Sequence, residues 1–224
     1  MRLDGVRVFV PDCPAALEAY TRLLGMSPAR VDDDLWRFQL ERGAVELTAG
    51  EGAEPHLAVL FAAERGDDLG AWPQDHGGLD VLVVSELPPP PLPAGAGISA
   101  IDHVVVSTSD PERAVAHWRD RLGLRLALDQ TFAERGVRLL FFRSGGLTLE
   151  YAYSLEGADQ SADDRVYGVS YRVGDLRAVR ARLLAAGIEV TEPRAGMKAG
   201  TTVATVRSGT AGVPTLLIQQ PPRA

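Results

Sequence analysis

The sequence contains a single cysteine and no long apolar run. With Cys13 alone, no disulfide can form within the chain, which favours a reducing compartment. The longest apolar stretch, residues 56–63, has the length of a strand and falls far short of the ~20 residues that a membrane helix needs. No signal-peptide pattern precedes the first expected strand. These absences predict a cytoplasmic protein with no membrane partner.

An excess of basic residues is also lacking. The chain has 30 acidic and 23 basic residues, a formal net charge of −7, and no basic cluster accompanies an aromatic run. This charge balance argues against nucleic acid as a partner. Because 46% of the 224 residues are hydrophobic, the chain can bury a core in one large domain or two small ones. A small-molecule substrate or ligand is the expected partner.

What the sequence does contain is an internal repeat. The segment Leu3–Val6 returns as Ile101–Val104, 98 positions later, and each copy continues into an apolar strand, an Asp and a short helix ending in Leu-Gly. A third copy begins at Tyr167–Val173 and is followed by a helix that ends at Gly187. The sequence therefore predicts repeated strand–helix modules.

A Pro- and Gly-rich stretch, residues 87–99, divides the modules into two predicted domains. It cannot continue a helix or a central strand, so we interpret it as a linker. Residues 1–86 then form a domain with a shortened second module, and residues 100–224 form a complete domain of two modules, 100–154 and 166–220. In the first domain we expect a helix over 14–24, a short helix near 67–72, and strands over 3–10, 27–32, 35–41, 44–48, 56–63 and 79–85.

The second helix of the repeat has clear start signals. Asp110 supplies an N-cap and Pro111 suits the first helical position. Val115, Trp118 and Leu122 follow at positions i, i+3 and i+7, which places them on one apolar stripe. This pattern predicts a helix whose stripe packs on a sheet.

Strand alternation sorts the polar residues of the second copy by face. Val104 and Val106 are expected to face the helix, so His103 faces the opposite side together with Val105. Glu150 lies on a single face of its own strand with Thr148 and Ala152. A carboxylate on a central strand is costly to bury, so we expect Glu150 to meet a metal, a cation or solvent.

Three motifs carry a family resemblance: Asp102-His103 opening a strand, Leu122-Gly123-Leu124 ending a helix, and Gly146-Leu147-Thr148-Leu149-Glu150 in a later strand. Together they resemble the vicinal oxygen chelate superfamily, which includes glyoxalase I, methylmalonyl-CoA epimerase, extradiol dioxygenases and bleomycin-binding proteins. The resemblance covers residues 100–220 well and 3–86 more loosely. It implies an α+β fold in which repeated βαβββ modules form cupped mixed sheets with helices on the outer face. It also implies a divalent metal ion (zinc, nickel, manganese or iron).

Carried over residue by residue, the resemblance predicts an incomplete ligand set in the second domain. His103 matches the first-strand metal ligand and Glu150 the fourth-strand ligand. Gly168 stands at the second His position, and Leu217 stands where a Glu is expected. Gln219, two residues on, is an alternative amide ligand and a candidate substrate-binding residue.

The first domain shows the complementary pattern. Gly5 replaces the first His, whereas Glu46 and His56 match the next two metal-ligand positions. Two arrangements stay open. Either one site lies in the second domain and is completed by water, substrate or Gln219, or a site is assembled across domains or subunits from His103, Glu150, Glu46 and His56.

The expected roles of three further side chains follow from their positions in the sequence alone. Arg172 shares a strand face with Gly168 and is either a substrate-binding group for a carboxylate or phosphate, or part of an edge salt bridge. His117 is expected on the exposed side of its helix and His76 in a Gly-rich loop, which predicts that both are surface residues.

Two classes of function fit this partial site. One is a metal-dependent lyase, isomerase or epimerase acting on a substrate with vicinal oxygens, with Glu150 as ligand and catalytic base. An extradiol dioxygenase is a subcase, although Gly168 removes one expected ligand. The other is a non-catalytic protein of the bleomycin-resistance type that binds a small molecule or antibiotic. The His103 and Glu150 pair favours the enzyme, and a homodimer that swaps modules stays open.

Overall fold

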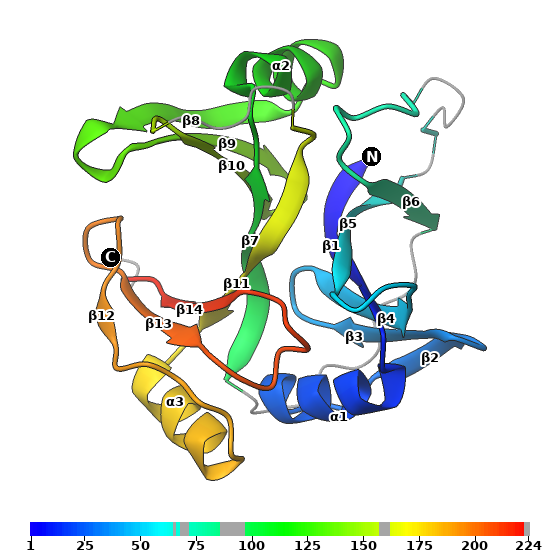
Figure 1. Cartoon of the computed structure of the whole chain (residues 1–224), viewed down its shortest axis with the longest axis vertical. Helices are drawn as coiled ribbons and strands as arrows, with labels where there is room; N and C mark the ends of the chain where they lie inside the picture. The colour runs from blue at the N-terminus through cyan, green and yellow to red at the C-terminus, as the bar shows by residue number, and fades with distance from the viewer. Residues whose placement is uncertain (65, 68–71, 86–96, 157–161, 222–224) are drawn as a thin grey trace. The chain divides into compact units, whose positions relative to one another are not determined.

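The computed structural model describes residues 1–64, 66–67, 72–85, 97–156 and 162–221 (Figure 1). Its α-helices are α1 (Cys13–Leu24), α2 (Pro111–Val115) and α3 (Leu176–Ala185). A π-helical turn, Ala116–Arg121, continues α2, and a 3-10 turn spans Ala133–Arg135. In the described part of the chain, no helix has the length and apolar composition to cross a membrane.

The first sheet has six strands in the order β2-β3-β4-β1-β5-β6. Strands β2, β3 and β4 pair antiparallel, whereas β5 and β6 pair parallel. The strand bounds are β1 (Arg2–Val10), β2 (Ala29–Asp32), β3 (Leu35–Gln39), β4 (Ala44–Ala49), β5 (His56–Ala63) and β6 (Val81–Ser85).

The second sheet has eight strands in the order β12-β13-β14-β11-β7-β10-β9-β8. The pairs β7–β10 and β11–β14 are parallel, and the outer strands are antiparallel. Its strands are β7 (Ile98–Ser107), β8 (Arg125–Phe132), β9 (Val137–Ser144), β10 (Leu147–Ser154), β11 (Arg165–Val173), β12 (Arg194–Ala195), β13 (Thr202–Val206) and β14 (Thr215–Gln219).

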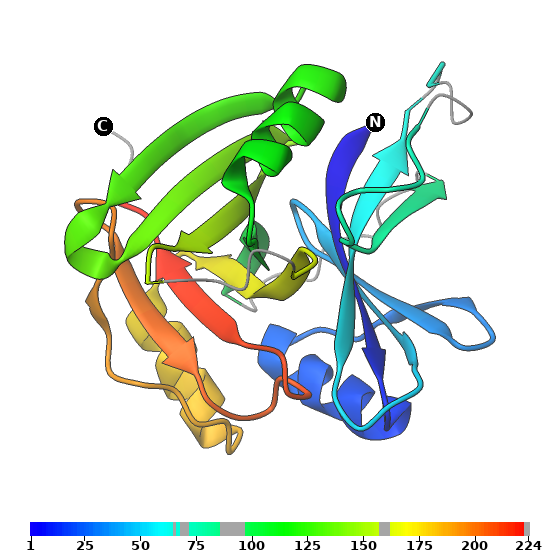
Figure 2. The ribbon, with the colours of Figure 1, turned by 45° about the horizontal axis from the view of Figure 1, so that its top comes forward.

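Among the described residues, the order strand, helix, three strands occurs three times. The three copies start at β1, β7 and β11, and each of α1, α2 and α3 follows the first strand of its copy. Strands β8, β9 and β10 curve strongly along their length (Figure 2). Mixed sheets with few helices confirm the predicted α+β class.

The predicted element bounds agree closely with the structure where residues are described. Strand 56–63 is reproduced as β5, and the expected helix 14–24 is α1, which begins one residue earlier. Most of the expected helix near 67–72 and of the linker 87–99 lies outside the described residues. The domain boundary at the linker therefore stays a prediction.

The chain forms two compact units that each combine segments from both halves of the sequence. The first contains Met1–Val6, Leu57–Leu87 and His103–Tyr167. At its core, the buried ring of Trp118 stacks on Phe61 of β5, with centroids 5.6 Å apart, and its Nε1 donates a 2.6 Å hydrogen bond to Tyr151 of β10. One side chain from the helical segment thus covers strands of both sheets.

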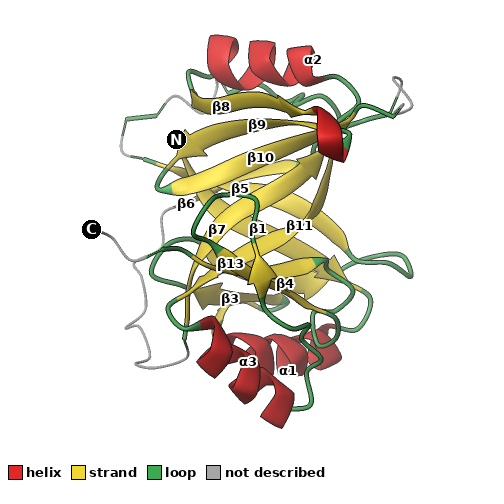
Figure 3. Cartoon of the chain, turned by 90° about the vertical axis from the view of Figure 1, so that its left-hand side faces the viewer, coloured by secondary structure: helices red, strands yellow, loops and turns green. Residues whose placement is uncertain are grey.

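The second unit contains Arg7–His56, Pro88–Asp102 and Gly168–Ala224. Within this unit α1 and α3 lie next to each other (Figure 3). Arg182 of α3 donates to the carbonyl oxygens of Arg22 and Leu23 at 2.8 and 2.7 Å. These carbonyls belong to the last turn of α1, so the guanidinium satisfies acceptors that the helix itself leaves open.

The histidines at 76 and 117 correct the sequence-based prediction that both are surface residues. His76 is 5% exposed, and its Nδ1 lies 2.9 Å from Nε2 of His117. The π-helical turn explains part of the error, because its hydrogen bond from Leu122 N–H to the His117 carbonyl spans five residues and shifts the phase of the helix. His117 is consequently half-buried beside Trp118.

Candidate functional site

His103 and Glu150 lie on adjacent parallel strands and face the same side of the sheet. In the register of β7 and β10, His103 is opposite Thr148 and Glu150 is opposite Val105. Val104 and Val106 are fully buried, whereas His103 and Val105 are half-buried. The predicted strand alternation is therefore confirmed, and it directs the two polar side chains away from the face that packs on the helix.

The two side chains form an ion-pair contact. His103 Nε2 lies 3.5 Å from Glu150 Oε2, and the side chains are 14% and 15% exposed. A carboxylate at this distance orients the imidazole. The pair also presents one nitrogen and one oxygen donor to a common point, which is suited to holding a cation or transferring a proton.

This donor set fits a divalent metal ion only in part. Imidazole nitrogen with carboxylate oxygen suits zinc, nickel, manganese or iron. Among the described residues, however, no group of three or more His, Cys, Asp and Glu side chains is arranged to hold a metal ion. A metal at His103 and Glu150 would therefore need further ligands from substrate or water.

The structure gives a steric reason for the glycine at the expected second His position. A Cβ at Gly168 would lie 2.3 Å from the Pro214 carbonyl oxygen and 3.0 Å from the Pro214 Cβ. The same carbonyl accepts the backbone N–H of Val169 at 3.0 Å, which holds the two segments together. No side chain fits at position 168 without moving the backbone of the neighbouring segment.

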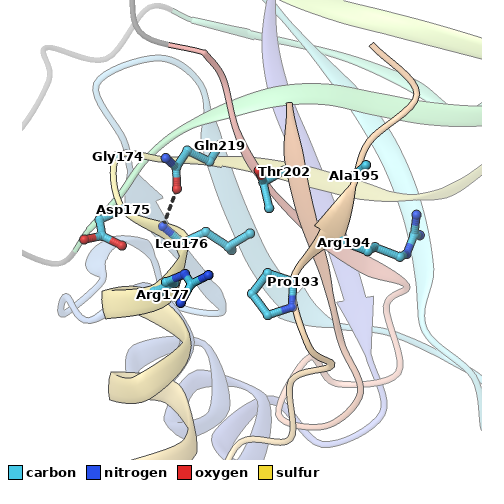
Figure 4. Close-up of a pocket in the computed structure, with 9 residues that line it drawn as sticks. All are labelled: Gly174, Asp175, Leu176, Arg177, Pro193, Arg194, Ala195, Thr202 and Gln219. Carbon is cyan, nitrogen blue, oxygen red and sulfur yellow. Dashed lines mark hydrogen bonds between the residues drawn. The ribbon is translucent and has the colours of Figure 1, made fainter. Parts of the chain in front are cut away.

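The candidate Gln219 is the last residue of β14, and its side chain contacts the first residue of α3. In the parallel register of β11 and β14 it is opposite Val173, and its Oε1 accepts the backbone N–H of Leu176 at 2.8 Å (Figure 4). Leu217 is fully buried. Gln219 also lines a pocket of about 430 Å³, together with Gly174, Asp175, Leu176, Arg177, Pro193, Arg194, Ala195 and Thr202.

Arg172 is engaged by an acidic residue that the sequence reasoning did not select. Its Nε donates to Asp102 Oδ1 at 2.9 Å, and Gln220 Nε2 donates to the same oxygen at 3.2 Å. Asp102 precedes His103 in the motif that carried the resemblance, so its position was a usable signal. The pair joins the neighbouring central strands β11 and β7 and so is not a salt bridge at a sheet edge. The substrate-binding role of Arg172 stays a prediction.

Glu46 and His56 lie in the second compact unit, in different surroundings. Glu46 is 1% exposed; its Oε1 accepts from Arg37 NH1 at 2.8 Å, and its Oε2 accepts from Arg7 Nε at 2.8 Å. His56 is exposed, and its ring centroid lies 5.8 Å from that of Phe9. The roles predicted for Glu46 and His56 as metal ligands stay predictions.

Comparisons with known proteins find a family resemblance in the second half of the chain. Residues 102–205 match the model of the Glyoxalase/Bleomycin resistance protein/Dioxygenase superfamily. The chain is 28% identical over 109 residues to an ethylmalonyl-CoA/methylmalonyl-CoA epimerase of Cereibacter sphaeroides, which covers 44% of this chain and 81% of that protein.

A solved structure supports the same fold. The crystal structure of methylmalonyl-CoA epimerase from Mycobacterium tuberculosis aligns with a TM-score of 0.51 and 20% identity, over 59% of this chain and 95% of that one. At this identity the likeness shows the fold alone. The predicted resemblance is confirmed by the match of residues 102–205 to the model of the Glyoxalase/Bleomycin resistance protein/Dioxygenase superfamily.

Proposed function

We propose that the chain is an epimerase or isomerase of this superfamily that acts on a small substrate with two neighbouring oxygens and uses a divalent metal ion. The observation that carries the proposal is the contact of His103 with Glu150, because it joins the two residues that match family ligand positions within the matched segment. A bound metal ion would polarise the substrate oxygens and make the hydrogen between them more acidic.

The chain's own residues then have distinct tasks. His103 offers an imidazole nitrogen as a ligand, and Glu150 offers a carboxylate oxygen. Glu150 is also the nearest candidate for moving a proton at the substrate carbon, since its partly exposed carboxylate lies beside His103. Arg172 meets a substrate carboxylate only if its guanidinium leaves Asp102.

The first substrate class to test is a 2-substituted malonyl thioester. Such a molecule has a thioester oxygen and a carboxylate oxygen on either side of one C–H bond. The Cereibacter sphaeroides relative carries the name ethylmalonyl-CoA/methylmalonyl-CoA epimerase, which supports this choice. Hemithioacetal and catechol substrates complete the panel, because they test isomerase and dioxygenase chemistry of the same superfamily.

The test combines metal content with exchange of the substrate hydrogen. Purified protein is loaded with zinc, nickel, manganese or iron and analysed for bound metal, and exchange of the C2 hydrogen in D₂O is followed by NMR. His103→Ala and Glu150→Ala are expected to lose both metal and exchange. Glu156→Ala, an exposed residue just after β10, is the matched control and is expected to keep both.

Two results would overturn the proposal. Retention of metal and exchange in either site variant would remove His103 and Glu150 from the mechanism. Absence of metal and of exchange with every substrate, combined with tight binding of a drug-like ligand, would instead favour the binding-protein function.

A further inference from the structure

Residues 72–80, here called the strap, connect to β6 and lie against α2 and its π-helical turn. His76, at the centre of the strap, is buried, as are Pro73 and Leu79, and its Nδ1 lies 2.9 Å from Nε2 of His117. Its ring stacks on Trp118, with centroids 5.6 Å apart and an interplanar angle of 14°. Trp72, also in the strap, packs against His76, with ring centroids 5.8 Å apart. One histidine therefore joins the strap to the helical segment by both stacking and hydrogen bonding.

A second attachment lies one residue further along. The carbonyl oxygen of Gly77 accepts the backbone N–H of Asp164 at 3.0 Å. The carboxylate of Asp164 is buried and accepts from Thr108 at 2.7 Å and from Arg113 at 2.8 Å. The Asp164 amide is thus a backbone reporter of whether the strap is closed.

The contact between the two imidazoles depends on protonation. One ring must donate and the other must accept, so the hydrogen bond is lost when both rings are protonated. Burial and, to a lesser extent, the neighbouring His117 lower the pKa of His76 to about 4. Burial and Arg121 also lower the pKa of His117.

Other charges around the strap act in both directions. Asp75 favours protonation of both histidines, whereas Arg121 opposes it. Burial raises the pKa of Asp164, which Thr108 and Arg113 counteract, so this carboxyl also responds to acid. The titratable and charged groups packed around the strap are Asp75, Arg113, His117, Arg121, Tyr151, Asp163 and Asp164.

We propose that residues 72–80 are an acid-released strap, which detaches from α2 when the His76 and His117 pair takes up protons. The closed strap also contains a buried indole N–H, that of Trp72, with no acceptor among the described residues. Opening hydrates this donor, which reduces the free-energy cost of release.

The direction of the effect follows from proton linkage. In the open strap His76 is in water and takes its ordinary pKa of 6.5, whereas in the closed strap its pKa is about 4. The open form therefore binds more protons between these values, and opening becomes more favourable as pH falls from 6.5 towards 4. From pH 7 to 4.5 we expect the open fraction to rise by on the order of tenfold to a hundredfold.

Hydrogen exchange of the Asp164 amide tests the proposal in the whole chain. The protection factor, which is the ratio of intrinsic to observed exchange rate at each pH, is expected to fall tenfold to a hundredfold between pH 7 and 4.5. The amide of Leu155, which donates to Gly136 in the same compact unit, is expected to keep its protection. A fall shared by both amides would indicate general unfolding and overturn the proposal.

Variants assign the response to a residue. His76→Gln cannot take up a proton, so its Asp164 protection is expected to stay constant over this pH range, apart from the titration of Asp164 itself. His56→Gln changes an exposed histidine of the other compact unit, and its Asp164 protection is expected to show the same pH response as the wild type. A full response in His76→Gln would overturn the proposal.

A measurement on the wild type covers the case in which His76→Gln does not fold. The ring protons of His76 are followed by NMR against pH. Titration below pH 5 is the expected result. Titration near pH 6.5 would show that the closed strap does not keep His76 neutral, and it would overturn the proposal.

Discussion

Arg37 and Glu46 lie directly opposite each other on β3 and β4, with the guanidinium NH1 2.8 Å from Glu46 Oε1. Arg7 of β1 takes the other carboxylate oxygen. The family resemblance matches Glu46 to a metal-ligand position, but here two guanidinium groups neutralise the carboxylate. A buried acid with this many donors is costly to disturb, because removing it leaves two cations without their partner.

Glu46→Gln is therefore expected to lower the free energy of unfolding by on the order of 3 kcal/mol. Urea denaturation measures the change. The metal content of the folded variant is expected to equal that of the wild type if His103 and Glu150 form the site alone. Loss of metal in Glu46→Gln would favour the site assembled from four residues.

Gly168→Ala is expected to destabilise the fold, because the new methyl group would collide with the Pro214 carbonyl oxygen. Overpacking of this kind costs ~1–3 kcal/mol. Gly174→Ala, at the other end of the same segment, is the control, since a Cβ there has no atom within 4 Å. Thermal unfolding compares the two variants. Equal stability would show that the backbone at Pro214 can move away from the new methyl group at little cost in free energy.

Arg182→Met is expected to lower stability by about 2 kcal/mol, because two carbonyls at the end of α1 lose a charged donor. Methionine retains much of the apolar stem, which isolates the loss of the guanidinium. Arg177→Met, on the exposed side of α3, is the control. Urea denaturation is the measurement, and similar midpoints for both variants would contradict the role assigned to Arg182.

Tyr151→Phe removes the acceptor of the Trp118 indole N–H and leaves a buried donor without a partner. Such a loss costs ~1–3 kcal/mol. Tyr153→Phe, two residues along β10, serves as the control and is expected to be nearly neutral. Metal content is expected to be unchanged in both variants, because Tyr151 faces the opposite side of the strand from Glu150; loss of metal in Tyr151→Phe alone would show coupling through β10.

Local signals in the sequence were sufficient to predict the elements. Asp12, Asp110 and Asp175 each accept the backbone N–H of the residue three positions on, as N-cap residues do. Strand alternation placed His103 and Glu150 on one face because that rule depends only on the strand itself. The repeat then carried these assignments from one copy to the next.

Such local rules could not predict contacts between residues far apart in the sequence. The position of Gln219 at the start of α3 depends on the register of β14 against β11. The burial of His76 depends on a partner 41 residues away and on a π-helical turn that changes the phase of its helix. No periodic pattern in a single segment contains this information.

The position of Trp118 between Phe61 and Tyr151 bears on how the duplicated modules can be separated. Phe61 comes before the Pro-rich stretch and Tyr151 comes after it, although both rings contact the same indole. A fragment cut at that stretch would keep Trp118 but lose Phe61, and would expose apolar surface that the full chain hides. Each half of the chain therefore covers apolar surface of the other within this one compact unit.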